Sequence, residues 1–516
     1  MKKLPIGIQD FDELISRGCV YVDKTKHIFN LIESGKYYFL SRPRRFGKSL
    51  LISVLKEIFA GNSNLFRGLW IENRINWDTY PVLRIDFSSM DYKNQKLDSA
   101  IIRNLVLQSE IHGVELIGNT YKEKFYTLVR KLGSERKVVL LIDEYDKPIV
   151  DYLTKTKKAV ENREILKNFY SSIKSLDPYL KFVFITGVSK FSKVSLFSDL
   201  NNLNDITSDQ NYSDMLGYTA QEIIRYFPDH LSETSNAMGK VRQELLDVMR
   251  EWYNGYSWDG KKFVYNPFSI LNFFSKHSFD NFWFSTGTPT FLVDYIREHG
   301  INTEKLEEKK VPAVFFDKFD IENLDIISVM FQTGYLTIKE VENSNTNRER
   351  YILSYPNEEV RISFLHNLLE SYAHSYLSAT GEALINIEDA LINKDIESFI
   401  ENLRTLFASI PYDLFIANME RYYHSIIFIT LRLIGVNIDT EIHTNKGRID
   451  AVIHTDSFIY IIEFKLDSAK NAMAQIHKNR YYERYVNDTR KIVLLAIGFS
   501  KEERNIGEWI ETIHPS

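Results

Sequence analysis

A strand, a glycine-lysine-serine turn and a helix follow one another between Lys36 and Gly61, and this succession constrains the fold more than any other feature. The stretch KYYFLS (36–41) is short, apolar and aromatic, which predicts a buried strand. The stretch 49–61 carries leucine, isoleucine and valine at helical spacing and stops at Gly61. A Gly-Lys-Ser sequence between a strand and a helix is the context in which a phosphate-binding loop is credible.

The chemistry of such a loop needs inward-facing backbone N–H groups, a lysine over the β- and γ-phosphates and a hydroxyl on Mg²⁺. The usual motif has a first glycine at position 42, where this chain has Arg42, and Pro43 has no N–H to offer. We expect Arg42 and Pro43 to turn the chain, so that changing Arg42 to glycine leaves nucleotide binding nearly unchanged. The alternative is a solvated basic turn. The expected cradle consists of Arg44, Arg45, Phe46, Gly47, Lys48 and Ser49.

A second stretch, KVVLLIDEYDKP (137–148), supplies acidic groups at a strand end. Its continuous apolar run is typical of a parallel strand that is buried on both faces, and ligands bind at the carboxyl ends of such strands. We expect Asp143 to hold Mg²⁺ through water and Glu144 to polarise an attacking water. Asp146 is interpreted as structural. A strand ending in Asp-Glu can also be an ordinary exposed loop, but its pairing with the Gly-Lys-Ser turn argues against that.

Two further apolar stretches, 82–88 and 181–192, alternate with amphipathic helices over residues 1–215. This alternation predicts a parallel sheet that is covered on both faces. The last of these strands ends in Thr186 and Ser189, and a polar group at that position could sense a γ-phosphate. We therefore include Ser189 among the candidate nucleotide-binding residues.

The chain has 516 residues, which is long enough for more than one domain. We find no run of eighteen apolar residues and no apolar signal segment near the N-terminus, so neither a membrane span nor a signal peptide is expected. Cys19 is the single cysteine, which excludes an intrachain disulfide and fits a reducing cytoplasm. The net charge of −5 provides no electrostatic argument for nucleic-acid binding by the chain as a whole.

The middle of the chain, residues 216–410, is expected to be mainly helical. Thr219 and Glu222 have the spacing of a capping box at a helix start. Turn signals at Asn254-Gly255 and Asp259-Gly260 precede another helix, and the arrangement suggests a lid or a winged-helix module. The polar stretch 341–360 contains a hairpin tip and is the best candidate for a linker.

Residues 411–516 are expected to form a separate α/β domain in the order helix, three strands, helix, strand. Asp450 lies in the second of these strands, and Glu463 and Lys465 share one face of the third. A turn at residues 456–457 lies midway between positions 450 and 463, which predicts that Asp450 and Glu463 face each other across a hairpin.

Two facing carboxylates can share a divalent metal ion, and Lys465 can orient or activate a water bound to it. Glu420 on the preceding helix can add a carboxylate, and Gln475 on the following helix can add an amide. The alternative is a solvated strand face, because Glu-x-Lys is common on edge strands. Charged groups at the end of a buried run need a partner or a metal, which favours a nuclease-type site.

Several stretches together resemble a bacterial family of AAA-like P-loop ATPases whose C-terminal domain is similar to PD-(D/E)XK nucleases. They are LPIGIQDFDELISRGCVYVDKT, RPRRFGKSLL, LIDEYDKPI, YNGYSW, VYNPFSILNFF and GTPTFLV. The resemblance covers nearly the whole chain and implies a P-loop ATPase joined to a restriction-endonuclease-like fold. By position, it implies ATPase roles for Lys48, Ser49, Asp143 and Glu144, and nuclease roles for Asp450, Glu463 and Lys465. The RPRR start resembles this family's usual form of the loop.

The expected function is therefore an ATP-hydrolysing, Mg²⁺-dependent enzyme directed at nucleic acid, at DNA rather than RNA, with oligomer formation left open. We expect its nucleotide state to control the C-terminal phosphodiesterase through the helical middle region. The alternative is a signalling ATPase whose nuclease-like domain only binds nucleic acid or a protein. Residues 412–516 contain 13 Lys and Arg against 14 Asp and Glu, a net of −1, whereas a DNA-binding domain normally has a basic face. Either the charge is segregated, with Lys465, Lys470, Lys478, Arg480 and Arg484 together, or nucleic acid is not the ligand.

Overall fold

In a computed structural model of the chain, the four predicted N-terminal strands form one parallel sheet with a short fifth strand. The strands are β1 (Tyr37–Ser41), β2 (Val82–Asp86), β3 (Val138–Asp143), β4 (Leu180–Gly187) and β5 (Asn204–Asp205). Their order is β2-β3-β4-β1-β5, so β4 lies between the strand before the Gly-Lys-Ser turn and the strand that carries Asp143. All neighbouring strands pair in parallel. The predicted parallel sheet is confirmed.

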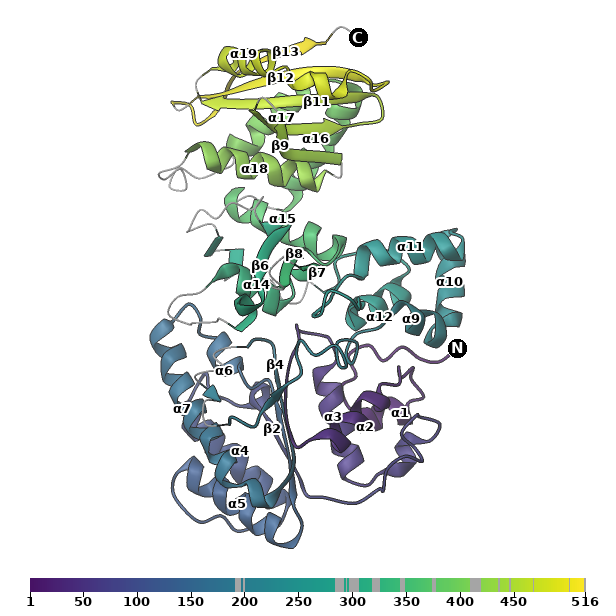
Figure 1. Cartoon of the computed structure of the whole chain (residues 1–516), viewed down its shortest axis with the longest axis vertical. Helices are drawn as coiled ribbons and strands as arrows, with labels where there is room; N and C mark the ends of the chain where they lie inside the picture. The colour runs from purple at the N-terminus through teal and green to yellow at the C-terminus, as the bar shows by residue number, and fades with distance from the viewer. Residues whose placement is uncertain are drawn as a thin grey trace. The chain divides into compact units, whose positions relative to one another are not determined.

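Helices cover both faces of this sheet, with α4, α5 and α7 on one side and α1 and α3 on the other (Figure 1). Their bounds are α1 (Phe11–Ser16), α2 (Thr25–Ser34), α3 (Lys48–Phe59), α4 (Leu97–Ile111), α5 (Tyr121–Glu135), α6 (Lys147–Val150) and α7 (Thr156–Ser175). Helix α3 begins directly after Gly47, whose left-handed φ of 90° suits glycine and turns the chain from the loop into the helix. The Gly-Lys-Ser turn therefore sits at a strand-to-helix junction, as expected.

The chain divides into two compact units: Met1–Gly287 with Glu308–Arg361, and Thr288–Glu307 with Ile362–Ser516. The predicted domain boundaries near residues 215 and 410 stay predictions. The residues described by the structure are 1–190, 196–197, 200–283, 292–293, 295–296, 306–317, 325–343, 349–373, 377–408, 419–434, 437–444, 447–466, 468–500 and 502–514. Most of the GTPTFLV motif lies outside them.

The remainder of the first unit contains helices and a small antiparallel sheet. Its elements are α9 (Ala220–Tyr226), α10 (Pro228–Met238), α11 (Arg242–Tyr253), α12 (Pro267–Lys276), β6 (Lys309–Pro312), α14 (Ile326–Thr333), β7 (Thr337–Asn343) and β8 (Glu349–Ser354). The predicted capping box is present, with the Thr219 side chain and the Glu222 side chain each bonded to the other's backbone N–H. The hairpin expected in the stretch 341–360 is confirmed, because Val341 pairs with Tyr351 in the β6-β8-β7 sheet, and this pairing contradicts the role of a linker.

The second unit contains a five-stranded mixed sheet in the order β13-β12-β11-β10-β9. Its elements are α16 (Leu377–Asn393), α17 (Ile396–Ala408), α18 (Met419–Leu433), β9 (Asn437–Thr444), β10 (Gly447–His454), β11 (Phe458–Leu466), α19 (Ala469–Asn479), β12 (Lys491–Ser500) and β13 (Asn505–Ile513). Helix α15 (Glu358–Ala373) begins in the first unit and continues into the second. Strands β11 and β12 are parallel, and the other neighbours are antiparallel.

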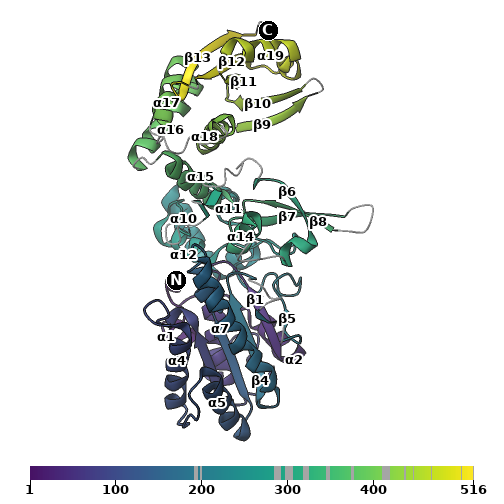
Figure 2. The same cartoon turned by 90° about the vertical axis from the view of Figure 1, so that its left-hand side faces the viewer.

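Helix α19 covers one face of this sheet, next to β11 and β12 (Figure 2). The apolar side chains of β11 at alternate positions, Ile459 and Ile461, pack there with Met473 and Ile476 of the helix. The same alternation places Glu463 and Lys465 on the helix-covered side. The predicted order of helix, three strands, helix and strand is confirmed, and β13 is an additional strand. Among the described residues, no helix has the length and apolarity that a membrane crossing requires.

Candidate active sites

The lysine of the turn is held inside its own loop. Lys48 is 6% exposed, and its ammonium group donates to the backbone carbonyls of Arg42 and Pro43, each at 2.9 Å. Burial lowers the pKa of Lys48, while the nearby carboxylates of Asp143 and Glu144 act in the opposite direction. These two carbonyl contacts are ones that a phosphate group could replace.

The acidic strand end lies beside the loop. The carboxylate of Asp143 is 1% exposed and lies 3.8 Å from the guanidinium of Arg84. Burial raises the pKa of Asp143, and the nearby Ser49 hydroxyl and Lys48 ammonium oppose this rise. Glu144 has a left-handed backbone (φ 49°), and burial also raises its pKa. The structure thus brings Lys48, Ser49, Asp143 and Glu144 together.

Asp146 holds the end of β4. Its buried carboxylate accepts hydrogen bonds from the backbone N–H groups of Val188 and Ser189, the latter at 2.7 Å, and from the Ser189 hydroxyl. The structural interpretation of Asp146 agrees with these contacts. The hydroxyl of Ser189 is bonded to this carboxylate here, and the Thr186 hydroxyl donates to the Leu40 carbonyl. A phosphate-sensing role for Ser189 stays a prediction.

Arg42 is not a simple turn residue. Its guanidinium is buried and donates to the backbone carbonyls of Ser41, Thr207 and Tyr212 at 2.9, 2.8 and 3.3 Å. It also lies 3.9 Å from the ring centroid of Trp258. Burial lowers the pKa of Arg42 to about 9. Glycine at position 42 would leave these carbonyls without their donor, whereas the expectation that it leaves nucleotide affinity nearly unchanged stays a prediction.

The next residues of the loop are anchored by aromatic groups from the middle of the chain. Phe46 is buried, with ring centroids 4.8 Å from Tyr256 and 5.4 Å from Trp258. Arg45 has a left-handed backbone (φ 68°) and places its guanidinium 3.8 Å from the ring centroid of Phe268. The side chains of Arg45 and Phe46 thus pack against aromatic groups, and the cradle expected from this stretch rests on its backbone. Sequence reasoning missed these contacts, although YNGYSW and VYNPFS contain the partners.

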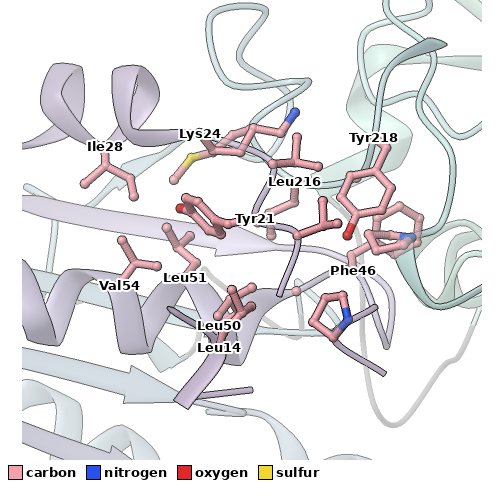
Figure 3. Close-up of a pocket in the computed structure, with 17 residues that line it drawn as sticks. Leu14, Tyr21, Lys24, Ile28, Phe46, Leu50, Leu51, Val54, Leu216 and Tyr218 are labelled. Atoms are coloured by element: carbon pink, nitrogen blue, oxygen red, sulfur yellow. The ribbon is translucent and has the colours of Figure 1, made fainter. Parts of the chain in front are cut away.

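A further feature that sequence reasoning missed is an apolar pocket beside the loop. Gly47 and the α3 residues Leu50, Leu51 and Val54 line one part of it, and Figure 3 shows Tyr21, Leu216 and Tyr218 around it. The other lining residues are Pro5, Leu14, Val20, Val22, Lys24, Ile28, Phe46, Met215, Gly217 and Pro267. A mainly apolar hollow next to a phosphate loop suits an aromatic base.

The C-terminal hairpin has the predicted register. Ala451 pairs with Ile462 and Val452 with Ile461, which centres the hairpin on residues 456–457. The carboxylate of Asp450 accepts a hydrogen bond from the backbone N–H of Phe464 at 2.9 Å. Asp450 is therefore fixed next to the strand that carries Glu463.

Glu463 is fully buried and forms the centre of this second site. Its Oε1 accepts a hydrogen bond from the side-chain amide of Gln475 and lies 3.4 Å from the ammonium of Lys465. Its Oε2 is buried with no hydrogen-bond partner among the described residues. Burial, and next the negative charge of Asp450, raise the pKa of Glu463 to about 8, while Lys465 opposes the rise.

The structure therefore brings together Asp450, Glu463, Lys465 and Gln475. Glu420 lies in α18, but the position of its side chain is outside the described part of the chain. The described residues contain no group of three or more His, Cys, Asp and Glu that could hold a metal ion. The described carboxylates at this site are those of Asp450 and Glu463. The orphaned oxygen of Glu463 is an acceptor that fits a cation.

Comparisons with known proteins match both parts of the chain. Residues 5–197 match the family model described as "Predicted AAA-ATPase", and residues 418–509 match the PD-(D/E)XK nuclease superfamily. The chain is also 40% identical over 521 aligned residues to the "Uncharacterized protein in vnfD 5'region" of Azotobacter chroococcum mcd 1, with 98% of each chain covered.

These findings define the class as an AAA-ATPase-like domain followed by a PD-(D/E)XK nuclease superfamily domain. The chain belongs to the family of the Azotobacter protein, which it matches over almost its whole length. The predicted resemblance is confirmed.

Proposed function

We propose that the N-terminal domain binds ATP with Mg²⁺ and hydrolyses it. The observation that carries this proposal is the buried ammonium of Lys48, which donates to two carbonyls of its own loop and lies near the carboxylates of Asp143 and Glu144, with Ser49 as the next residue. A hydroxyl and a carboxylate at this place fit a hydrated Mg²⁺ beside the phosphates, and Glu144 is the adjacent group for orienting water. The expected ligand set of the phosphates is the backbone of residues 44–49 with Lys48, and Ser189 is the candidate sensor.

The apolar pocket beside Gly47 is the proposed place of the adenine base. Leu50 and Leu51 follow the loop directly and line the pocket, so a base there would lie within one nucleotide's length of the phosphates (Figure 3). Lys24 at its edge is already bonded to Glu222 and to the Asp214 carbonyl. The middle helices would act as a lid or a winged-helix module over this domain.

Two substitutions test the ATPase. Lys48→Ala removes the cation over the β- and γ-phosphates and should abolish tight nucleotide binding, measured with a fluorescent ATP analogue. Glu144→Gln should keep binding and slow hydrolysis by orders of magnitude, because the group that orients the water is lost. Hydrolysis by Glu144→Gln at the wild-type rate would remove Glu144 from the proposed mechanism.

We further propose that the C-terminal domain is a Mg²⁺-dependent nuclease that acts on DNA in preference to RNA. The supporting observation is the geometry around Glu463, where Lys465 and Gln475 occupy one carboxylate oxygen and the other is buried without a partner among the described residues. Asp450 and Glu463 would hold the metal ion, with Glu420 as a third candidate ligand. A bound Mg²⁺ supplies a polarised water and stabilises charge on a phosphate oxygen. Lys465 can hold or orient that water.

Cleavage of labelled DNA and RNA by the purified full chain tests this site. Asp450→Asn should abolish Mg²⁺-dependent cleavage, because it weakens the proposed metal site. Asp456→Asn is the matched control, since Asp456 is an exposed carboxylate at the turn of the same hairpin. Equal cleavage by both variants would refute the assignment of Asp450.

A second candidate function is an ATPase signalling switch whose nuclease-like domain binds nucleic acid or a protein without cutting. The observation that favours it is the net charge of −1 over residues 412–516. Lys470, Lys478, Arg480 and Arg484 are exposed, and Arg480 is paired with Glu483. Binding of DNA without cleavage by wild-type protein under any nucleotide and metal condition would favour this candidate. A cytoplasmic location is a further part of the proposal, and oligomer formation stays open.

A further inference from the structure

Trp283 connects the phosphate loop to another part of the first unit. Its indole N–H donates to the backbone carbonyl of Arg44, inside the loop, at 3.1 Å. Its ring packs against Tyr335 at a centroid distance of 5.3 Å and against Tyr256 at 6.4 Å. Tyr256 in turn contacts Phe46 of the loop. A rigid, buried side chain is thus bonded to the loop backbone and packed against the loop's aromatic anchor.

The backbone of Trp283 is itself fixed by a buried acid. The N–H of Trp283 donates to Oε1 of Glu359 at 2.6 Å, and the Ser269 hydroxyl donates to Oε2 at 2.7 Å. Glu359 is fully buried, so these bonds satisfy a carboxylate that has no access to water. Glu359 thus holds the backbone of Trp283 through one hydrogen bond, and Trp283 holds the backbone of Arg44 through another.

Glu359 lies in the first turn of α15, and the division between the two compact units falls within this helix, after Arg361. Two hydrogen bonds of Trp283 therefore connect the phosphate loop to α15. Its indole N–H donates to the Arg44 carbonyl, and its backbone N–H donates to the Glu359 carboxylate. Loop and helix are more than 300 residues apart in the sequence, and the helix continues along the chain into the unit that carries Asp450 and Glu463.

We propose that Trp283 and Glu359 are positioning residues through which nucleotide binding at the loop changes the anchoring of the first turn of α15. This inference rests on the proposed nucleotide site. Binding of phosphate requires Lys48 to leave the carbonyls of Arg42 and Pro43, which are the two residues before Arg44. A rearrangement there moves the Arg44 carbonyl, and the rigid indole passes the displacement to Glu359. Packed side-chain contacts change between discrete arrangements rather than continuously, so a small shift of the loop can change the contacts of the helix.

Hydrogen exchange of the full chain, with and without ATP and Mg²⁺, tests the proposal. The wild type should show slower exchange in residues 44–49 and a changed exchange rate in residues 358–373 when nucleotide binds. Trp283→Phe removes the indole N–H and keeps an aromatic ring. It should change the nucleotide Kd by no more than about tenfold, the range of one lost neutral hydrogen bond. At saturating ATP it should keep the response of the loop and lose that of residues 358–373.

Trp77→Phe is the matched control, because Trp77 also donates its indole N–H to a backbone carbonyl, that of Glu72, at 3.0 Å. It should respond as the wild type does. Glu359→Gln is a second variant that keeps the size of the side chain and weakens its acceptor, so it should reduce the response of residues 358–373 in the same direction.

A full response of residues 358–373 in both Trp283→Phe and Glu359→Gln would overturn the proposal. So would a wild type that binds ATP without any change in these residues. A wild type that binds no ATP would instead overturn the proposed nucleotide site, and this inference with it.

Discussion

Replacement of Arg42 by methionine should destabilise the first unit strongly, because this guanidinium is an internal anchor. The variant loses three hydrogen bonds to the carbonyls of Ser41, Thr207 and Tyr212 and a close contact with the Trp258 ring. A buried carbonyl left without a donor costs about 1–3 kcal/mol, and a desolvated cation–π contact contributes about 2 kcal/mol. Methionine avoids the cost of burying a charge, which offsets part of the loss. We therefore expect a net loss of about 3–5 kcal/mol.

This loss is a large part of the stability of an ordinary domain, about 5–15 kcal/mol, so the urea concentration at which the unit unfolds should fall markedly. Intrinsic tryptophan fluorescence can follow the unfolding. Arg136→Met is the matched control, because Arg136 also lies over a ring, that of Tyr80, and pairs with Asp78, but its side chain is 47% exposed. An exposed pair of this kind contributes within about 1 kcal/mol. A shift for Arg42→Met no larger than the control's would refute the anchoring role, and weaker ATP binding at unchanged stability would indicate a phosphate contact instead.

Three further predictions concern buried carboxylates. The pKa of Glu463 is raised to about 8, so below that pH a metal ion must displace a proton from this carboxyl group. The affinity for Mn²⁺, measured by calorimetry, should therefore rise from pH 6 to about 8 and then level off. An affinity independent of pH would contradict this prediction. Asp146→Asn should weaken the hydrogen bonds to Val188 and Ser189 and lower the unfolding temperature. An unchanged unfolding temperature would show that these bonds contribute little to stability. Burial raises the pKa of Glu359 to about 7, above its value in the unfolded chain, so its contribution to stability is present at low pH and is lost as pH rises through 7. Glu359→Gln should flatten that pH dependence in urea titrations, and an unaltered pH profile would exclude Glu359 as its source.

Much of the fold follows from local sequence patterns. Strands β1 and β3 are predictable because each is a continuous apolar run, and the hairpin register follows from the turn at residues 456–457. Strand β5 has only two residues, and β13 mixes exposed polar side chains with apolar ones, so neither has a strong pattern. Their formation depends on partner strands that are already in place.

The site could be predicted where its groups lie close together in the sequence or, as for Asp143, at the end of a continuous apolar strand. Gly47, Lys48 and Ser49 are consecutive, and Glu463 and Lys465 are two positions apart on a strand. Apart from the adjacent Ser41, the hydrogen-bond partners of Arg42 are more than 160 residues away, so nothing near position 42 indicates that this arginine is buried. The same holds for Trp283 and Arg44, which meet through tertiary packing across 239 positions.

We propose that the nucleotide state of the N-terminal domain controls the proposed metal-dependent nuclease of the C-terminal domain. Cleavage of labelled DNA by the full chain in Mg²⁺ tests it most directly, with ATP present or absent and with Glu144→Gln and Glu463→Gln beside the wild type. We predict cleavage that needs Mg²⁺ and changes with ATP, that persists in Glu144→Gln with ATP bound, and that is lost in Glu463→Gln. Cleavage that survives in Glu463→Gln, or that is the same with and without ATP, would contradict the claim.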